Sequence, residues 1–195
     1  MRRVRYSVAM SLDGYIAGPN GEADWIVMDP EVGAGFADFY KQFDTFLIGR
    51  KTFTAIAKPG KSPSGHFAGF KVVVVSRTLD PRDYPNTTIL SDGVTEAITK
   101  MKQEPGKDIW LFGGGGLFRS LLDLGLVDTV EVGVIPMLLG GGIPLLPAPA
   151  NRAALTLVSH RAYPKTGTLS LEYAVMKNVK GMKATKKGMK ATKTS

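Results

Sequence analysis

The sequence predicts an α/β fold in which helices flank a central, mixed but mostly parallel sheet of about eight strands. Short apolar runs recur along the chain with turn residues between them, and helical patterns are interleaved with these runs. The last two runs alternate apolar with polar residues, which is typical of an antiparallel hairpin at a sheet edge. At 195 residues, the chain has the length of one compact domain.

The expected elements alternate along the chain. Strands are predicted at 4–10, 44–49, 71–76, 86–90, 108–112, 128–134, 155–161 and 168–176. Helices are predicted at 31–43, 51–57, 93–103 and 115–123. The runs "KVVVVSRT" and "DIWLFG" are apolar without alternation, as expected for central strands that helices cover on both faces. The turn sequence "YPKTG" separates the last two strands, so they form the predicted hairpin.

A lysine-rich repeat follows the predicted domain. The unit "KGMKATK" occurs at 180–186 and again at 187–193, without a sustained apolar face that could pack. We therefore expect one domain over 1–176 and a disordered tail over 177–195. The tail carries seven of the eight net positive charges, so the domain is nearly neutral. A solvated tail is the simpler interpretation, and weak, salt-sensitive attraction to nucleic acid or other polyanions is the alternative.

Composition limits the classes of function. There are no cysteines and only two histidines, so disulfides and thiolate metal sites are excluded and a His-rich metal site is not expected. No apolar run approaches the roughly 20 residues that span a membrane. The segment "MRRVRYSVAMSLDG" is interpreted as a first strand rather than a signal peptide, because its apolar residues alternate and Asp13 comes early. We expect a cytoplasmic protein with no metal ion and no membrane partner.

Three groups of residues follow predicted strands, the positions where open α/β sheets bind ligands. The first group is Gly49, Arg50, Lys51 and Thr52, at the start of a predicted helix. A glycine admits a ligand to the backbone, free N–H groups open the helix, and two cations add charge, which together suit a phosphate or pyrophosphate. An ordinary strand-to-helix turn with solvated basic residues is the alternative.

The second group, Ser76, Arg77 and Thr78, follows "KVVVV". It places two hydroxyls and a guanidinium where a phosphate monoester could be held. Charge-assisted hydrogen bonds of this kind contribute roughly 1.5 to 3 kcal/mol each, enough for about a tenfold preference for a phosphorylated cofactor. A polar strand end without a ligand is the alternative.

The third group is the run Gly113, Gly114, Gly115 and Gly116, followed by Leu117. It matches neither the dinucleotide pattern G-x-G-x-x-G nor the phosphate loop G-x-x-x-x-G-K-[ST]. A strand, then glycines, then an amphipathic helix still leaves backbone N–H groups open to an anion at the helix N-terminus. Close packing of the helix against the strand is the alternative explanation.

Five motifs occur in an order that resembles the dihydrofolate reductase fold. They are "VAMSLDGYIAG", "LIGRKTF", "VVVVSRT", "IWLFGGGGLFRSLL" and "VDTVEVGVIPMLLGGGIPLLP". They look most like the branch that contains the reductase domain of bacterial riboflavin biosynthesis, the RibD C-terminal domain, and the resemblance covers residues 1 to about 176. It implies a three-layer α/β fold, a small-molecule substrate and, as in riboflavin-type relatives, a homodimer.

The resemblance also implies an NADPH site, position by position. Ala9, Ile16 and Ala17 would line the nicotinamide. The pyrophosphate would lie between Gly49, Arg50, Lys51 and Thr52 on one side and Gly113, Gly114, Gly115, Gly116 and Leu117 on the other. The adenosine 2′-phosphate would be bound by Ser76, Arg77 and Thr78, which predicts NADPH over NADH.

The substrate half departs from both relatives. Dihydrofolate reductases carry a carboxylate early in the helix before "GRKT", a position that falls here near Gly35 or Phe36. Riboflavin-type reductases typically carry a glutamate immediately before their glycine pair, where this chain has Phe112 and Gly113. Asp13 is then the predicted proton source, because a carboxyl with a raised pKa, or a water that it orients, could complete a hydride transfer. A loop-closing role in the Asp-Gly turn is the alternative.

Trp25 resembles the aromatic residue that lines the active site in the family, with a plain core tryptophan as the alternative. These expectations favour an NADPH-dependent reductase that transfers hydride to a small heterocycle, most like the riboflavin-pathway reductase of 5-amino-6-(5-phosphoribosylamino)uracil. A dihydrofolate or pterin-type reductase is one alternative. A non-catalytic NADPH-binding protein, or a nucleic-acid-associated protein that uses the lysine repeat, are the alternatives from other classes.

Overall fold

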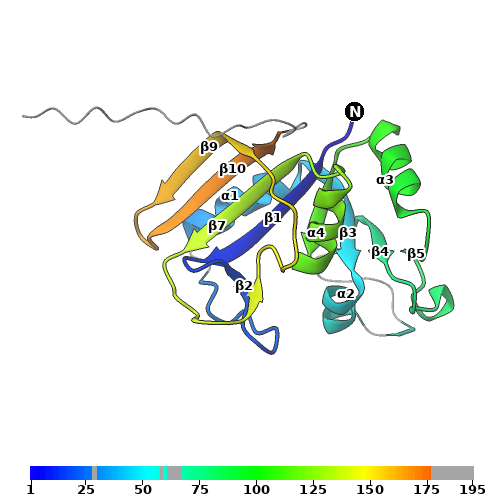
Figure 1. Cartoon of the computed structure of the whole chain (residues 1–195), viewed down its shortest axis with the longest axis horizontal. Coiled ribbons are helices and arrows are strands. Elements are labelled where there is room, and N and C mark those ends of the chain that lie inside the picture. Colours follow the sequence, from blue (N-terminus) through cyan, green and yellow to red (C-terminus); the bar gives the residue numbers. More distant parts are fainter. Residues whose placement is uncertain (28–29, 58, 61–66, 177–195) are drawn as a thin grey trace, which may run out of the picture.

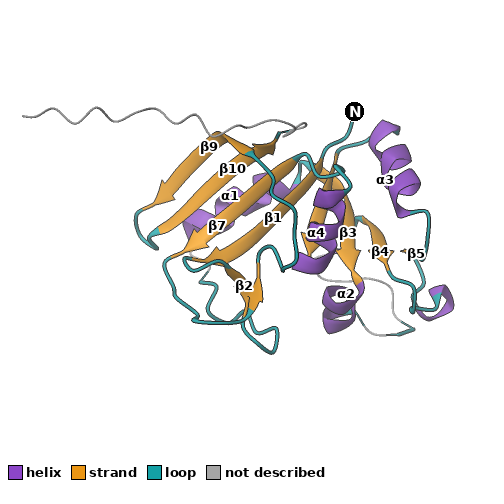
Figure 2. Ribbon diagram, viewed as in Figure 1, coloured by secondary structure: helices purple, strands orange, loops and turns teal. Residues whose placement is uncertain are grey.

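The computed structural model describes residues 1–27, 30–57, 59–60 and 67–176, and the predicted tail lies outside these residues (Figure 1). The strands are β1 (Val4–Ser11), β2 (Tyr15–Ala17), β3 (Phe43–Gly49), β4 (Lys71–Val75), β5 (Thr87–Leu90), β6 (Asp108–Gly113), β7 (Thr129–Ile135), β8 (Ile143–Pro144), β9 (Leu155–Tyr163) and β10 (Thr168–Val175). The helices are α1 (Pro30–Tyr40), α2 (Arg50–Ile56), α3 (Val94–Gln103) and α4 (Gly115–Asp123), and residues Pro81–Asp83 form a 3₁₀ turn (Figure 2).

Eight strands form one sheet in the order β5-β4-β3-β6-β1-β7-β10-β9. Every pairing from β5 to β7 is parallel, and β10 runs antiparallel to both β7 and β9. The short strands β2 and β8 form a separate antiparallel pair. The predicted α/β class, the mostly parallel sheet and the C-terminal hairpin are therefore confirmed.

An apolar cluster covers each face of the sheet. On the face toward the viewer in Figure 1, α3 and α4 pack on the sheet through Ile98, Phe118 and Leu121, which contact the cluster that contains Val4 and Tyr6. On the other face, α1 and α2 contribute to a second cluster through Phe39, Tyr40 and Phe53, with Phe46, Val72, Val74 and Trp110 from the strands. The helices thus form two outer layers around the sheet, as the apolar central strands predict.

Trp110 lies at the centre of the second cluster. The rings of Phe39, Tyr40, Phe43 and Phe46 have centroids 5.0 to 5.3 Å from the Trp110 ring. The Trp110 indole N–H donates to the Ser7 carbonyl at 3.1 Å, so its polar atom is satisfied. This aromatic packing seats α1 against β3 and β6, and a pair of this kind contributes about 0.5 to 1.5 kcal/mol beyond its buried area.

A buried ion pair lies on the same face, beneath α1. Arg5 donates to both carboxylate oxygens of Glu131, at 2.6 and 3.0 Å, and also to Gln42 and Asp108. The guanidinium stands 4.7 Å from the centre of the Phe43 ring. Arg5 is 4% exposed and Glu131 8%, so the pair joins β1 to β7 in a site with little water.

Two details differ from the sequence prediction. The helix expected to run to residue 43 ends at Tyr40, because Gln42 turns back to bond the Phe39 carbonyl and Phe43 begins β3. The short strands β2 and β8 were not predicted, and they place Tyr15–Ala17 against the segment before β9. Among the described residues, no helix is long and apolar enough to cross a membrane.

Candidate active site at the carboxyl edge of the sheet

The strand order brings the predicted site residues to one edge. The strands β4, β3, β6 and β1 are neighbours in the sheet and parallel, so their carboxyl ends lie in a row. In register, Gly49 pairs with Val75, and Ile48 pairs with Gly113. In Figure 1 the arrowheads of β1, β3 and β7 point to this edge, where β2 and α2 also lie. The groups at Gly49, Ser76, Gly113 and Asp13 therefore follow adjacent strands.

The glycines that end β3 and β6 contact one another. A Cβ built at Gly49 would lie 3.6 Å from the Gly113 carbonyl oxygen and 3.5 Å from the Leu117 Cβ. A Cβ at Gly114 would lie 3.0 Å from the Thr52 hydroxyl oxygen. Gly113 has a φ of 151°, a conformation that side chains disfavour, and the Gly113–Gly114 peptide bond is cis. The first and third predicted groups thus form one continuous glycine-lined surface.

The start of α4 exposes backbone donors on this surface. Gly114 is the N-cap and has no side chain to cap the helix, and its carbonyl accepts from the N–H groups of Leu117 and Phe118. The N–H groups of Gly115 and Gly116 therefore lack an acceptor within the helix. A Cβ at Gly116 would meet nothing within 4 Å, so its Cα borders open space. An anion could approach there without contacting a side chain.

Gly115 differs from the other glycines of the run. A Cβ at Gly115 would lie 2.8 Å from the Pro144 carbonyl oxygen and 3.0 Å from Pro147, and the residue is buried. Its Cα therefore packs against the segment around β8 instead of bordering the open space. Close packing, the alternative explanation of the run, accounts for this glycine, whereas the open approach belongs to Gly116.

The basic and hydroxyl side chains at this edge differ in their exposure to solvent. Arg50, Lys51, Arg77 and Thr78 are exposed, and Arg77 forms no hydrogen bond or ion pair with any residue that the structure describes. Ser76 is buried, and its hydroxyl oxygen accepts from the N–H groups of Thr78 and Leu79. Ser76 thus shapes the turn that carries Arg77, and its O–H hydrogen remains available to another acceptor.

The residues predicted to line the nicotinamide come from two neighbouring elements. Ala9 is half-buried near the end of β1 and pairs with Gly133 of β7, where a Cβ would also meet nothing within 4 Å. Ile16 and Ala17 lie on β2, and Ala17 pairs with Ile143 of β8. Small residues on β1 and β7 therefore leave room on the face of the sheet that α1 covers.

Asp13 connects the loops at this edge through hydrogen bonds. Its carboxylate accepts from the Ser11 hydroxyl at 2.6 Å, the Gly140 N–H at 2.7 Å and the Leu139 N–H at 3.1 Å. The Ser11 oxygen in turn accepts from the Tyr15 N–H at 3.0 Å. One carboxylate thus connects the end of β1, the start of β2 and the β7–β8 loop.

The prediction that the Asp13 pKa is raised is wrong, because the hydrogen bonds to its carboxylate lower it. The hydrogen bond from Ser11, followed by those from Gly140 and Leu139, lowers the pKa of the Asp13 carboxyl below its usual value. A group that is ionised at neutral pH does not act as a proton donor. The loop-closing alternative therefore describes Asp13 better than the role of general acid.

Trp25 lies between β2 and α1 and is half-buried, with its indole N–H 3.4 Å from the Glu22 carbonyl.

A cluster next to the start of α1 was not predicted from the sequence. Arg161 pairs with Glu31 at 3.0 Å and stands 4.7 Å from the Tyr163 ring centre. Glu31 is an acid in the first turn of α1, a signal that the sequence contains, but its partner lies 130 residues away.

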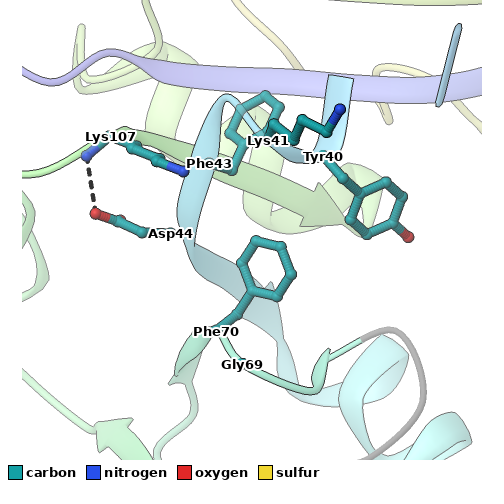
Figure 3. A pocket seen from close by; sticks show the side chains of 7 residues that line it. All are labelled: Tyr40, Lys41, Phe43, Asp44, Gly69, Phe70 and Lys107. Carbon is teal, nitrogen blue, oxygen red and sulfur yellow. Dashed lines mark hydrogen bonds between the residues drawn. The ribbon is translucent and has the colours of Figure 1, made fainter. Parts of the chain in front are cut away.

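Two cavities lie away from this edge. One, of about 350 Å³, opens at the opposite edge beside the start of β3, between the rings of Tyr40, Phe43 and Phe70 (Figure 3). There the Lys107 N–H donates to Asp44 at 2.8 Å (Figure 3). The second cavity, of about 490 Å³, lies beside α4. In the part of the chain that the structure describes, no group of three or more His, Asp or Glu could hold a metal ion.

The carboxyl edge fits the phosphates of a dinucleotide better than either cavity does. It combines open space at Gly116, two uncapped N–H groups, and the guanidinium of Arg77, which pairs with no described residue, at a neighbouring strand end. Backbone donors and cations in this arrangement suit anionic oxygens.

The sheet topology and this glycine-lined edge define a protein of the dihydrofolate reductase fold class. The dihydrofolate reductase from Enterococcus faecalis, solved in complex with NADP(H), has a similar fold with a TM-score of 0.63 and 16% identity, over 89% of this chain and 96% of that chain. Residues 2–169 match the model of the RibD C-terminal domain, and the chain belongs to this family. The resemblance stated from the sequence is confirmed.

Two further proteins are similar to this chain, one in sequence and one in fold. The uncharacterized protein YyaP of Bacillus subtilis (strain 168) is 37% identical over 181 residues, 88% of this chain and 94% of that protein. The diaminohydroxyphosphoribosylaminopyrimidine deaminase/5-amino-6-(5-phosphoribosylamino)uracil reductase from Thermotoga maritima has a TM-score of 0.69 and 16% identity, over 90% of this chain and 57% of that chain. The chain thus corresponds to part of that two-activity protein.

Proposed function

We propose that this protein is an NADPH-dependent reductase that transfers hydride to a small heterocycle of the pyrimidine type. The observation that carries the proposal is the open space at Gly116 beside the N-terminus of α4, with Arg77, which pairs with no described residue, at a neighbouring strand end. The uracil reductase named in the Thermotoga maritima structure and the NADP(H) complex of the dihydrofolate reductase support the substrate class and the cofactor.

Each group of residues has a part in this proposal. The N–H groups of Gly115 and Gly116 and the cations Arg50 and Lys51 hold the pyrophosphate. Arg77, with the O–H of Ser76 and Thr78, holds the 2′-phosphate, since a guanidinium pairs with phosphate oxygens in a fixed geometry. Bound NADPH supplies the hydride, and the protein supplies orientation and electrostatics.

The substrate would lie on the α1 side of β1 and β7, where Ala9 and Gly133 leave room. Asp13 positions the walls of this space by joining the β1–β2 and β7–β8 loops. Because the Asp13 pKa is lowered, we assign the proton that completes the reduction to water at this exposed edge.

An activity assay tests the proposed function. Consumption of NADPH is measured with 5-amino-6-(5-phosphoribosylamino)uracil and, separately, with dihydrofolate as substrate. We expect turnover with the pyrimidine, and loss of turnover in Gly116→Val, because the valine side chain fills the open space beside the helix N-terminus. The control is Ser120→Val, one turn further along α4, which should keep activity. Turnover with dihydrofolate alone would replace the substrate assignment, and no NADPH oxidation with either would contradict the proposal.

A further inference from the structure

The second cavity lies under the segment that joins β8 to β9, residues 145–154, which we call the strap. The strap is attached along its length. The Leu145 N–H donates to the Gly14 carbonyl at 2.9 Å, Arg119 to the Pro149 carbonyl at 3.4 Å, and Asn151 to Asp123 at 3.0 Å. Figure 1 shows the strap as a yellow trace that runs beside α4 from β8 to β9. A fixed strap over the sheet gives the cavity a defined wall.

The walls of the cavity are apolar. They come from α4, β7, the strap and β9, through Phe118, Leu122, Val130, Leu145, Leu146 and Leu155. The cavity measures about 490 Å³, within the range of about 300 to 1,000 Å³ that small-molecule sites occupy. Leu155 is 42% exposed, so an occupant that covered it would bury apolar surface that is now in water.

The polar residues of the cavity lie next to each other in the strap. The Asn151 amide donates a hydrogen bond to Asp123, whereas Arg152 has no hydrogen bond or ion pair with any described residue. Arg119 is engaged by the Pro149 carbonyl. Among the described residues, the charged groups of this region are Arg119, Arg152 and Asp123, and Arg152 is the one that forms no hydrogen bond or ion pair with another described residue. Apolar walls with a single unpaired cation are complementary to an amphiphile with one acidic group.

We propose that this cavity binds an apolar carboxylate of the medium-chain fatty acid type, with its chain between α4 and the strap and its carboxylate on Arg152. The residues that line the cavity include none of the carboxyl-edge groups, namely Asp13, residues 49–52, residues 76–78 and residues 113–117. Its ligand therefore does not compete with a dinucleotide at Gly116.

Calorimetric titration of the full chain with decanoate, and in parallel with decanol, tests the site. We expect saturable binding of decanoate at one site, unchanged by NADPH. Arg152→Gln should weaken decanoate binding by about tenfold and leave decanol binding unchanged, because it removes one charge-assisted hydrogen bond. The control Lys165→Gln removes an exposed cation from the turn between β9 and β10 and should change neither affinity.

A second variant tests the cavity itself. Ala150→Trp places a large ring in the cavity from an exposed position on the strap, so the core stays intact and binding of both ligands should be lost at an unchanged melting temperature. The proposal would be overturned if the Ala150→Trp variant still bound decanoate, or if Arg152→Gln left the affinity for decanoate unchanged. So would absence of binding, including the case in which sedimentation shows that a second copy of the chain covers this face.

Discussion

At the scale of single residues, Asp13 has the most informative environment at the carboxyl edge. Its carboxylate accepts hydrogen bonds from the Ser11 hydroxyl, at the end of β1, and from the Leu139 and Gly140 N–H groups, in the β7–β8 loop. These donors favour the ionised form and lower its pKa. A lowered pKa means that ionised Asp13 stabilises the folded chain above the pKa that this group has in the unfolded chain, and that this contribution is lost as the pH falls through the folded value.

Asp13→Asn should therefore lower the free energy of unfolding at neutral pH, because the amide cannot accept from all three donors. The difference between wild type and variant should begin to shrink below about pH 4, where Asp13 of the unfolded chain takes up a proton, and should be lost as the pH falls through the lower pKa of Asp13 in the folded chain. Urea unfolding at several pH values measures it, with Asp24→Asn, an exposed loop carboxylate, as the control. A difference that stays constant with pH would show that Asp13 does not act through its charge.

At the scale of elements, the start of α4 has two glycines with opposite requirements. A Cβ at Gly115 would lie 2.8 Å from a backbone oxygen of Pro144, whereas a Cβ at Gly116 would meet nothing. Overpacking against a backbone atom costs about 1 to 3 kcal/mol, and replacing an unconstrained helical glycine by alanine stabilises by about 0.5 to 1 kcal/mol.

Gly115→Ala should then be destabilised by about 1 to 3 kcal/mol, while Gly116→Ala should be as stable as wild type or slightly more so. Chemical denaturation of the two variants side by side provides the measurement, and each serves as the matched control of the other. Equal effects of the two substitutions would mean that the segment around β8 does not pack on Gly115.

The elements that the sequence could predict are those with a strong local pattern. The central strands β4 and β6 are continuous apolar runs, and β9 and β10 alternate around an evident turn. The pair β2 and β8 could not be found this way, because three residues and two residues are too short for any period. The end of α1 was placed too late, since the aromatic pattern of Phe36, Phe39 and Tyr40 continues into β3 at Phe43.

In the candidate site too, the features with a local sequence pattern could be predicted, and those that depend on distant contacts could not. The groups at Gly49, Ser76 and Gly113 could be found because each follows a strand directly, and the sheet order places those strands side by side. Ser11 lies two residues from Asp13, but the Leu139 and Gly140 donors of Asp13 and the Arg161 partner of Glu31 lie 126 to 130 residues away, so the sequence does not reveal these longer-range contacts. The contact of Gly115 with Pro144 likewise depends on how the β8 segment folds back.

At the scale of the whole molecule, the Arg5–Glu131 pair joins the centre of the sheet under α1. Both side chains are buried, and Arg5 also bonds Gln42 and Asp108, from the turn before β3 and the start of β6. Removing one partner leaves the other charge buried without compensation, which costs about 3 to 5 kcal/mol, while replacing both by apolar residues is often near neutral.

We therefore expect Arg5→Met alone to lower the free energy of unfolding by about 3 to 5 kcal/mol. The double variant Arg5→Met/Glu131→Met should recover most of this loss, which denaturant titration of the two proteins can show. A double variant that is less stable than the single one would mean that the pair itself stabilises the sheet, contrary to this account.

Our central proposal is that adjacent strand ends at the carboxyl edge together form one NADPH site. Its most direct test is the ratio of the Kd values for NADH and NADPH in wild type, Arg77→Gln and Lys71→Gln, which remove one cation from opposite ends of β4. We predict that wild type and Lys71→Gln bind NADPH at least about tenfold more tightly than NADH, and that Arg77→Gln loses most of this preference. Equal affinity of wild type for the two dinucleotides, or an unchanged ratio in Arg77→Gln, would contradict the account.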